Sequence, residues 1–336
     1  MSRTPNHSPG CTISSRWART SSSAPALPGA ATIVVGVDEL ADSSALQGDP
    51  DALCLRLAQD GYLFFRGLLP TALVRAAADG VLAKLRRGGW VDSRGNPSPD
   101  RRALNVMDAL GDPAFRAAIA SPAFNRLPYV VQLRRLVRMV LGPTAFSYPV
   151  KILRAVYPEH PPGVARGRYV HQDYAVSGVQ DMLTTWVPLM EIPVALGGLA
   201  VQPGSHLGPP QRPRLLGECE HGWATTNYRA GDVLVFHCLT SHAALPNHAT
   251  SLRLSGDFRW QLPDQIAPAQ LVLAPAGGRR ELFSRVFGRE PWWEPVPGEI
   301  TLSPREQLAA IPPGRSRYFA VHPGWQHWQL PGGAVH

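Results

Sequence analysis

The sequence predicts a mainly β protein with flanking helices, and three observations lead to that fold class. The chain has 336 residues, of which 34 are proline and 31 are glycine, so turns interrupt it too often for a helical bundle. Amphipathic helical patterns dominate residues 45–142. After Gly142, short runs of β-branched and aromatic residues alternate with turn residues, which is typical of a sandwich or barrel.

The part before Gly142 predicts helices around one strand. A capping aspartate and a terminal glycine bound a short helix over residues 50–61. The apolar run YLFFRGLL (62–69) predicts a strand, and a helix with proline in its first turn follows over 70–87. A loop and two further helices are expected at 88–103, 112–120 and 127–141.

Composition divides the chain into four parts. Residues 1–32 contain no acidic residue and are rich in Ser, Pro, Ala, Thr and Arg, which predicts a disordered tail. A helical front part (33–142) packs on a β core (143–262). The Pro- and Trp-rich residues 263–336 are expected to extend the same domain.

Composition also excludes several function classes. No stretch approaches the ~18 consecutive apolar residues of a membrane-spanning helix. Lys and Arg outnumber Asp and Glu by 33 to 25, but the basic residues are scattered, so we expect no nucleic-acid partner. Four cysteines, at positions 11, 54, 219 and 238, lack zinc-site spacing and indicate a reduced cytoplasmic protein.

The strongest chemical signal is His171-Gln172-Asp173, with His242 downstream. On a strand, His171 and Asp173 would point to the same side, roughly 7 Å apart. A second histidine from a neighbouring strand completes a two-histidine, one-carboxylate triad, which leaves positions open and suits non-haem Fe(II). Further on, Arg253 and Ser255 share one strand face and offer a guanidinium and a hydroxyl to a carboxylate.

With these residues in place, the chain resembles the phytanoyl-CoA dioxygenase (PhyH) family of Fe(II)/2-oxoglutarate-dependent oxygenases. The resemblance extends over about residues 50–262, and within the family it is strongest to bacterial hydroxylases that tailor terpenoids and other secondary metabolites. The motifs that carry it are HQDY (171–174), TTWVPL (184–189), GGLAVQPGSH (197–206), GDVLVFHCLTSHAALPN (231–247) and RLSGDFRW (253–260).

The resemblance implies a double-stranded β-helix, or cupin-like jelly roll, with the metal inside one mouth. It assigns His171, Asp173 and His242 as iron ligands, with 2-oxoglutarate and O2 as cosubstrates. Arg253 would hold the distal carboxylate of 2-oxoglutarate with help from Ser255. Because this family's halogenases replace the carboxylate ligand by a small residue, the retained aspartate favours hydroxylation.

Four further residues carry weaker expectations. Trp186 would line the cosubstrate pocket or serve as a core aromatic. Arg154 would bind a substrate carboxylate or pair at the surface, and Arg259 has the same two alternatives. Gln172 is a substrate candidate, although strand alternation turns it away from the ligands.

The resemblance implies an enzyme that oxidises a small, natural-product-type substrate, which we expect to be apolar and carboxylated. A free amino acid and an acyl thioester stay open as substrates. Two other functions also stay open: a non-catalytic jelly-roll binding protein, and the same chemistry on nucleic acid, which the net charge of +8 suggests. Neither the substrate nor the oligomeric state follows from the sequence.

Overall fold

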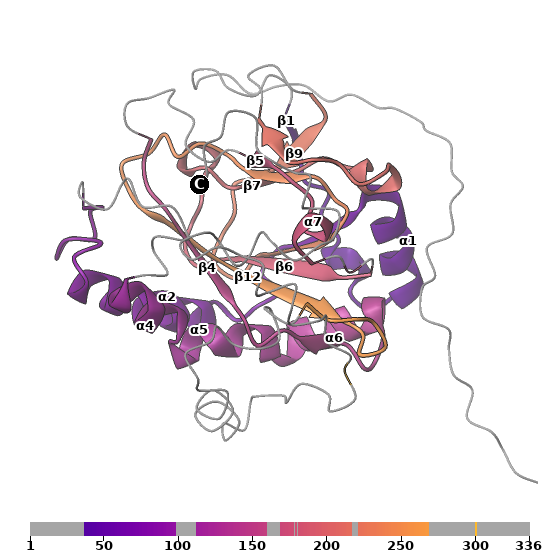
Figure 1. The fold of residues 1–336 in the computed structure, drawn as a ribbon, viewed down its shortest axis with the longest axis horizontal. Coiled ribbons are helices and arrows are strands. Elements are labelled where there is room, and N and C mark those ends of the chain that lie inside the picture. The colour runs from indigo at the N-terminus through magenta and orange to yellow at the C-terminus, as the bar shows by residue number, and fades with distance from the viewer. Residues whose placement is uncertain are drawn as a thin grey trace, which may run out of the picture.

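Two β-sheets lie face to face in a jelly roll, and helices cover the outer side of the larger sheet (Figure 1). The computed structural model describes residues 37–98, 112–159, 169–177, 179, 181–216, 221–268 and 300. Within these residues the predicted fold class, a mainly β protein with a double-stranded β-helix core and flanking helices, is confirmed. The predictions for residues 1–32 and for most of 263–336 lie outside the described residues.

The larger sheet has six strands in the order β2-β10-β6-β12-β3, with β4 also paired to β12. Its strands are β2 (Tyr62–Phe65), β3 (Phe146–Ser147), β4 (Ile152–Val156), β6 (Leu183–Pro188), β10 (Val233–His237) and β12 (Arg253–Gln261). β2 is shorter than the predicted strand over 62–69. The strand stops early because Gly67 adopts a positive φ of 58° and turns the chain toward the next helix.

The smaller sheet has four strands in the order β1-β9-β7-β11, and a two-stranded sheet lies beside it. These strands are β1 (Val37–Glu39), β9 (Trp223–Thr225), β7 (Leu199–Val201), β11 (His242–Ala244), β5 (Tyr169–Val170) and β8 (Arg214–Leu215). Sequence reasoning missed β1, β8 and β9, because two or three residues are too few to show strand periodicity.

The helices follow the sequence pattern with small shifts in their bounds. The Asp49 carboxylate accepts a main-chain N–H from the first turn of α1 at 3.0 Å, and Gly61 ends that helix with a φ of 78°. The predicted helix over 127–141 begins only at Val131, because Pro128 lies in a 3-10 turn. The helices are α1 (Pro50–Asp60), α2 (Thr71–Arg87), α4 (Pro113–Ile119), α5 (Pro122–Arg126), α6 (Val131–Leu141) and α7 (Tyr174–Ser177), with 3-10 turns η1 (Ser44–Leu46), η3 (Leu127–Tyr129), η4 (Val194–Leu196) and η5 (Ser205–Leu207).

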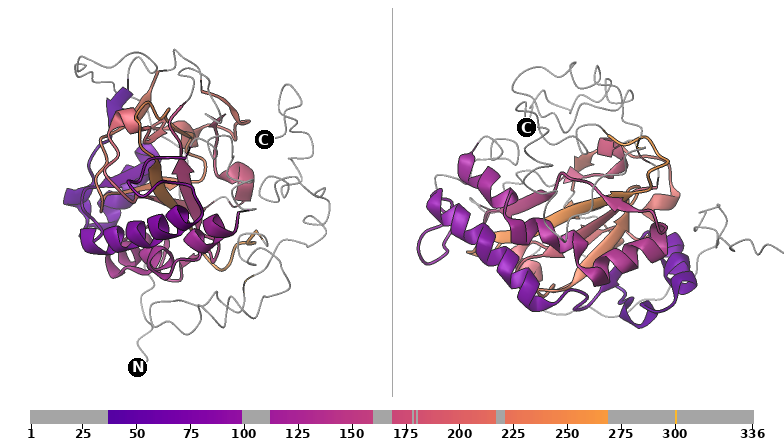
Figure 2. Two further views of the ribbon diagram at one scale, coloured as in Figure 1. Left: turned by 90° about the vertical axis from the view of Figure 1, so that its left-hand side faces the viewer. Right: turned by 90° about the horizontal axis from the view of Figure 1, so that it is seen from below.

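The larger sheet separates two apolar layers. On β10, Val233 and Val235 pack with the helices, while Leu234 and Phe236 point between the sheets. Seen from below in Figure 2, the purple and magenta helices lie across the outer face of this sheet. None of the helices that the structure describes is long and apolar enough to cross a membrane.

β12 carries a polar inner face in the space between the sheets. Its even-numbered Leu254, Phe258 and Trp260 pack in the helix-facing core. The odd-numbered side chains on the opposite face are all buried and polar, and they are Arg253, Ser255, Asp257, Arg259 and Gln261. A strand that buries polar groups on one face and apolar groups on the other needs partners for the polar face.

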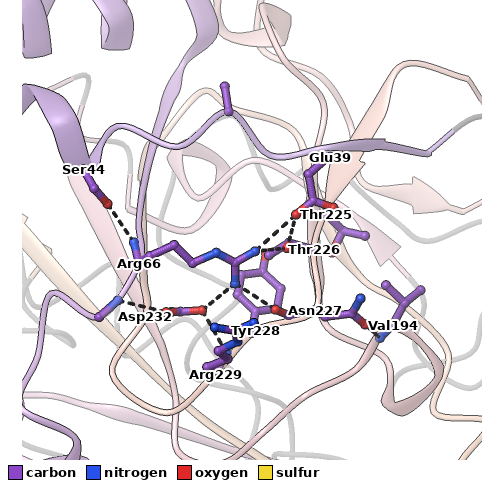
Figure 3. Close-up of polar contacts among 12 residues, drawn as sticks. Glu39, Ser44, Arg66, Val194, Thr225, Thr226, Asn227, Tyr228, Arg229 and Asp232 are labelled. Atoms are coloured by element: carbon purple, nitrogen blue, oxygen red, sulfur yellow. Dashed lines mark hydrogen bonds and ion pairs between the residues drawn. The ribbon is translucent and has the colours of Figure 1, made fainter. Parts of the chain in front are cut away.

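A separate charged cluster around Arg66 ties β1, β2 and the turn before β10 together (Figure 3). One terminal nitrogen of Arg66 donates to the main-chain oxygen of Asn227 and to Asp232, both at 2.8 Å. The other donates to Glu39 at 3.2 Å and to the Thr226 hydroxyl. These contacts join three segments that are distant in sequence.

Candidate metal centre and cosubstrate pocket

The two candidate histidine ligands meet where the chain brings β5 next to β11. His171 follows β5 directly, and His242 is the first residue of β11. Their main chains form an isolated antiparallel bridge, with N–H···O distances of 3.1 and 3.0 Å. His242 thus starts a strand of the smaller sheet, beside the end of β5, which agrees with the expected neighbouring strand.

Asp173 completes the group two residues after His171. Strand pairing ends at His171, so Asp173 lies in the turn that leads into α7. One ligand atom from each of the three residues lies within 4.8 Å of the others, as binding to a single metal ion requires. The predicted triad is therefore assembled in space, although strand alternation alone does not produce it.

Main-chain carbonyls fix how the two histidines present their rings. The Nδ1 atom of His171 lies 3.1 Å from the carbonyl oxygen of Tyr169, and that of His242 lies 3.0 Å from the carbonyl oxygen of Thr240. A carbonyl oxygen only accepts, so Nδ1 carries the proton in both rings. Each Nε2 is left with a free lone pair, which is the form that binds a metal.

Protonation states in the site also suit a divalent cation. Burial lowers the pKa of His171 to about 3, and it lowers the pKa of His242 as well. Burial by itself would raise the pKa of Asp173, but the charges of Arg259 and His242 hold it below its usual value. At neutral pH the group therefore consists of two neutral imidazoles and one carboxylate.

Arg259 makes a bidentate ion pair with Asp173. Its Nη2 donates to Oδ1 at 2.8 Å and its Nε donates to Oδ2 at 3.2 Å. The Thr184 hydroxyl also donates to Oδ2. We predicted Arg259 near the substrate or at the surface; the structure places its guanidinium on the candidate metal-binding carboxylate.

Arg253 lies on the same inner face of β12, six residues before Arg259 and at the start of the strand. The side chain is fully buried, and its Nη1 donates to the main-chain oxygen of Gly197 at 2.7 Å. Burial lowers the pKa of Arg253 to about 10, so the guanidinium remains charged at neutral pH. The Trp186 ring lies 5.9 Å from it and packs on Tyr228 at 4.6 Å, so Trp186 is both a core aromatic and a neighbour of the predicted anchor.

Three buried polar atoms beside this guanidinium have no hydrogen-bond partner among the described residues. They are Nε of Arg253, Oγ of Ser255 and Oδ1 of Asp257. Buried polar atoms in folded proteins are nearly always paired, so the unpaired donors of Arg253 and Ser255 are candidates for binding an acceptor, which the acceptor Oδ1 of Asp257 is not. The guanidinium and the hydroxyl fit the carboxylate of 2-oxoglutarate.

The two remaining predicted residues differ in their surroundings. Arg154 of β4 stands opposite Ser255 of β12, and its Nε donates to Asp257 at 2.9 Å while 29% of its side chain stays exposed. Gln172 is buried, and both ends of its amide bind main chain, at Leu239 and Gln211. We therefore assign Gln172 no role in substrate binding.

Sequence reasoning missed the roles of Asp257 and Thr184. Asp257 was detectable, because it shares the odd positions of one strand with Arg253 and Ser255. Thr184 carries no such signal, since its contact with Asp173 depends on how β6 and the turn before α7 are placed in space.

The family model described as phytanoyl-CoA dioxygenase (PhyH) matches residues 57–255. The chain belongs to the PhyH family. It is an enzyme of the non-haem Fe(II)/2-oxoglutarate-dependent oxygenase class, and it is similar to hydroxylases of biosynthesis. The candidate metal centre and the Arg253 pocket both lie within the matched range.

Two curated relatives carry the same name, 1-deoxypentalenic acid 11-beta-hydroxylase. The protein from Streptomyces exfoliatus is 26% identical over 249 residues, which cover 67% of this chain and 86% of the relative. The protein from Streptomyces arenae is 25% identical over 250 residues, which cover 66% and 85%.

Among solved structures, similar chains include the epimerase SnoN in complex with Fe3+, alpha ketoglutarate and nogalamycin RO. It is 20% identical with a TM-score of 0.48, covering 76% of this chain and 98% of SnoN. EctD from S. alaskensis with 2-oxoglutarate and 5-hydroxyectoine is 18% identical, also with a TM-score of 0.48, covering 80% and 91%.

Proposed function

We propose that the protein hydroxylates an unactivated C–H bond of a small natural-product-type molecule, consuming 2-oxoglutarate and O2 and releasing succinate and CO2. The observation that carries this proposal is the joint presence of a His-Asp-His group and a buried arginine with unpaired polar neighbours. O2 would supply the oxidising power, iron would activate it with electrons from 2-oxoglutarate, and the chain supplies ligands, orientation and exclusion of water.

The proposed role of each ligand residue follows from the side-chain atom that it has available to bind a metal. His171 and His242 each offer Nε2, because Nδ1 is engaged with a carbonyl. Asp173 offers Oδ1, the oxygen that lies 4.0 Å from Nε2 of His242. Three protein ligands on one face leave three of six positions for 2-oxoglutarate and O2.

Arg253 and Ser255 would hold the distal carboxylate of 2-oxoglutarate. Both have a donor without a protein partner in the described part of the chain, and the guanidinium remains charged at neutral pH. Trp186 covers one side of this pocket. Desolvated charge-assisted hydrogen bonds of this kind are strong, which suits a cosubstrate that must be bound before the substrate reacts.

We further propose that the substrate is an apolar carboxylic acid that Arg154 binds. Arg154 and His171 are only partly buried, so solvent reaches the site on their side. Asp257 holds the guanidinium through Nε, and the two Nη atoms have no partner among the described residues, which leaves the paired donors that suit a carboxylate. The name of the two relatives, which act on 1-deoxypentalenic acid, supports the same substrate class.

Succinate release under Fe(II), 2-oxoglutarate and O2 tests both proposals. The panel contains 1-deoxypentalenic acid, its methyl ester, a free amino acid and an acyl thioester. We expect release with the acid and less with the ester, because the ester removes the charge that Arg154 would bind. Arg154→Gln should raise KM for the acid and leave the ester unchanged.

The substrate class, the role of Arg154 and the oxygenase chemistry each have an outcome that would contradict them. Release with the amino acid or thioester alone would overturn the substrate class and leave the chemistry in place. Equal KM values for acid and ester would remove Arg154 from substrate binding. No succinate above background with any substrate, together with no binding of 2-oxoglutarate, would contradict the oxygenase proposal itself.

A further inference from the structure

The two oxygens of the Asp173 carboxylate have different surroundings. Among the described residues, Oδ2 accepts from the Thr184 hydroxyl and from Nε of Arg259, whereas Oδ1 accepts only from Nη2 of Arg259. A carboxylate oxygen has about two lone-pair sites. Oδ2 is therefore filled, and Oδ1 keeps one site, on the side of His242.

The sheet holds both donors in place. Arg259 of β12 and Thr184 of β6 are directly paired across the strands, and both side chains are buried on the inner face. Side chains paired this way lie about 5 Å apart and are fixed by the strand register. The strand register of the larger sheet thus fixes the hydrogen bonds that Arg259 and Thr184 donate to Asp173. The two histidines come from the other side of the jelly roll.

We propose that Arg259 and Thr184 are positioning residues that limit Asp173 to metal binding through Oδ1 alone. This inference rests on the proposed function. A carboxylate that bound through both oxygens would occupy four of six positions together with the histidines. Only two would then remain, although 2-oxoglutarate takes two and O2 needs a third. Blocking Oδ2 keeps that third position open.

Four variants separate this role from simple packing. Thr184→Val removes the hydroxyl at nearly constant shape, and Thr184→Ser restores it. Arg259→Lys keeps a charge but cannot donate from two nitrogens in one plane. Thr185→Val is the matched control, because the neighbouring hydroxyl donates to the main-chain oxygen of Phe258 and accepts from the indole N–H of Trp260, away from the metal centre.

The experiment is done without O2, so that no turnover is needed. Fe(II) affinity is measured by competition with a chelator, and 2-oxoglutarate affinity is then measured from the visible charge-transfer band. We expect Thr184→Val and Arg259→Lys to bind Fe(II) and 2-oxoglutarate, but with a shifted band, because the second carboxylate oxygen would take the position that O2 needs. Thr184→Ser and Thr185→Val should match the wild type.

Three results would overturn the inference. An unchanged band in Thr184→Val would show that Oδ2 needs no blocking. Loss of Fe(II) binding by folded Thr184→Val would show that the hydroxyl only orients the carboxylate. Absence of any band in the wild type would contradict the proposed function itself, and the inference with it. If Arg259→Lys does not fold, the comparison of Thr184→Val with Thr184→Ser tests the inference by itself.

Discussion

The Arg66 cluster and the inner face of β12 are both charged groups inside the fold, yet their hydrogen bonding differs. At Arg66, both terminal nitrogens have two acceptors each, and both oxygens of Asp232 have donors. On β12, Arg253, Ser255 and Asp257 each keep a buried polar atom without a partner among the described residues. The first arrangement is complete without a ligand, and the second is not.

This difference separates a structural charge cluster from a binding site better than charge or burial does. A satisfied network fixes segments relative to one another, as Arg66 does for β1, β2 and the turn before β10 (Figure 3). An unsatisfied one costs stability, which a fold tolerates where a ligand completes it. Changes in the two regions should therefore affect different observables.

The largest effect is expected at the metal centre. His171→Ala removes one of three ligands, so succinate formation should fall by about a thousandfold or more, since metal catalysis contributes several kcal/mol. The melting temperature should stay near that of the wild type, because the ring is only partly buried. Activity near the wild-type value would remove His171 from the metal site.

In the Arg66 cluster the effect should be on stability instead. Asp232→Ala removes one acceptor of the guanidinium and the side-chain acceptor of two main-chain N–H groups, at a cost of about 3 kcal/mol in unfolding free energy. Urea denaturation measures this loss. The folded fraction should still bind Fe(II) and 2-oxoglutarate as the wild type does; weaker binding per folded molecule would mean that the two regions are coupled.

Arg253→Gln tests the inner face of β12 at the proposed anchor for 2-oxoglutarate. Losing the charge-assisted bonds should raise the 2-oxoglutarate requirement by at least about thirtyfold, which corresponds to roughly 2 kcal/mol. Steady-state kinetics at saturating Fe(II) give the value. A wild-type requirement for 2-oxoglutarate would place the anchor elsewhere.

Lys151 extends the comparison to a buried amine whose polar partners are all neutral. Its Nζ donates to Ser147 at 2.8 Å and to Tyr129 at 3.3 Å, and burial holds its pKa well below the usual 10.5. The unfolded chain binds this proton up to about pH 10.5, so wild-type stability should fall as pH drops below that value, by up to about 1.4 kcal/mol per pH unit. Lys151→Met should flatten that slope between pH 8 and 10 in urea titrations, and an unchanged slope would mean that Lys151 is charged in the fold.

The smallest effect is expected from Ser255→Ala. Its hydroxyl has no partner in the part of the chain that the structure describes, so its removal should leave stability unchanged or raise it by up to about 1 kcal/mol. Binding of 2-oxoglutarate should weaken by about fivefold. Thr226→Val, the matched change in the Arg66 cluster, should instead lower stability by about 1 kcal/mol and leave binding intact.

The sequence was sufficient for the fold class and for the grouping of His171, Asp173 and His242, because the residue types and their order along the chain carry that information. It was insufficient for Arg259, whose contact with Asp173 depends on placing β12 beside β6 and the turn before α7 near both. The short strands β1, β8 and β9 were missed because they form through pairing with distant segments and have little pattern of their own.

An anaerobic titration with Fe(II) and 2-oxoglutarate, followed by visible absorption, tests the central claim most directly. The wild type should develop a charge-transfer band that saturates with both components, and His242→Ala should not. A folded wild type without the band, or a band that persists in His242→Ala, would contradict the assignment of the metal centre.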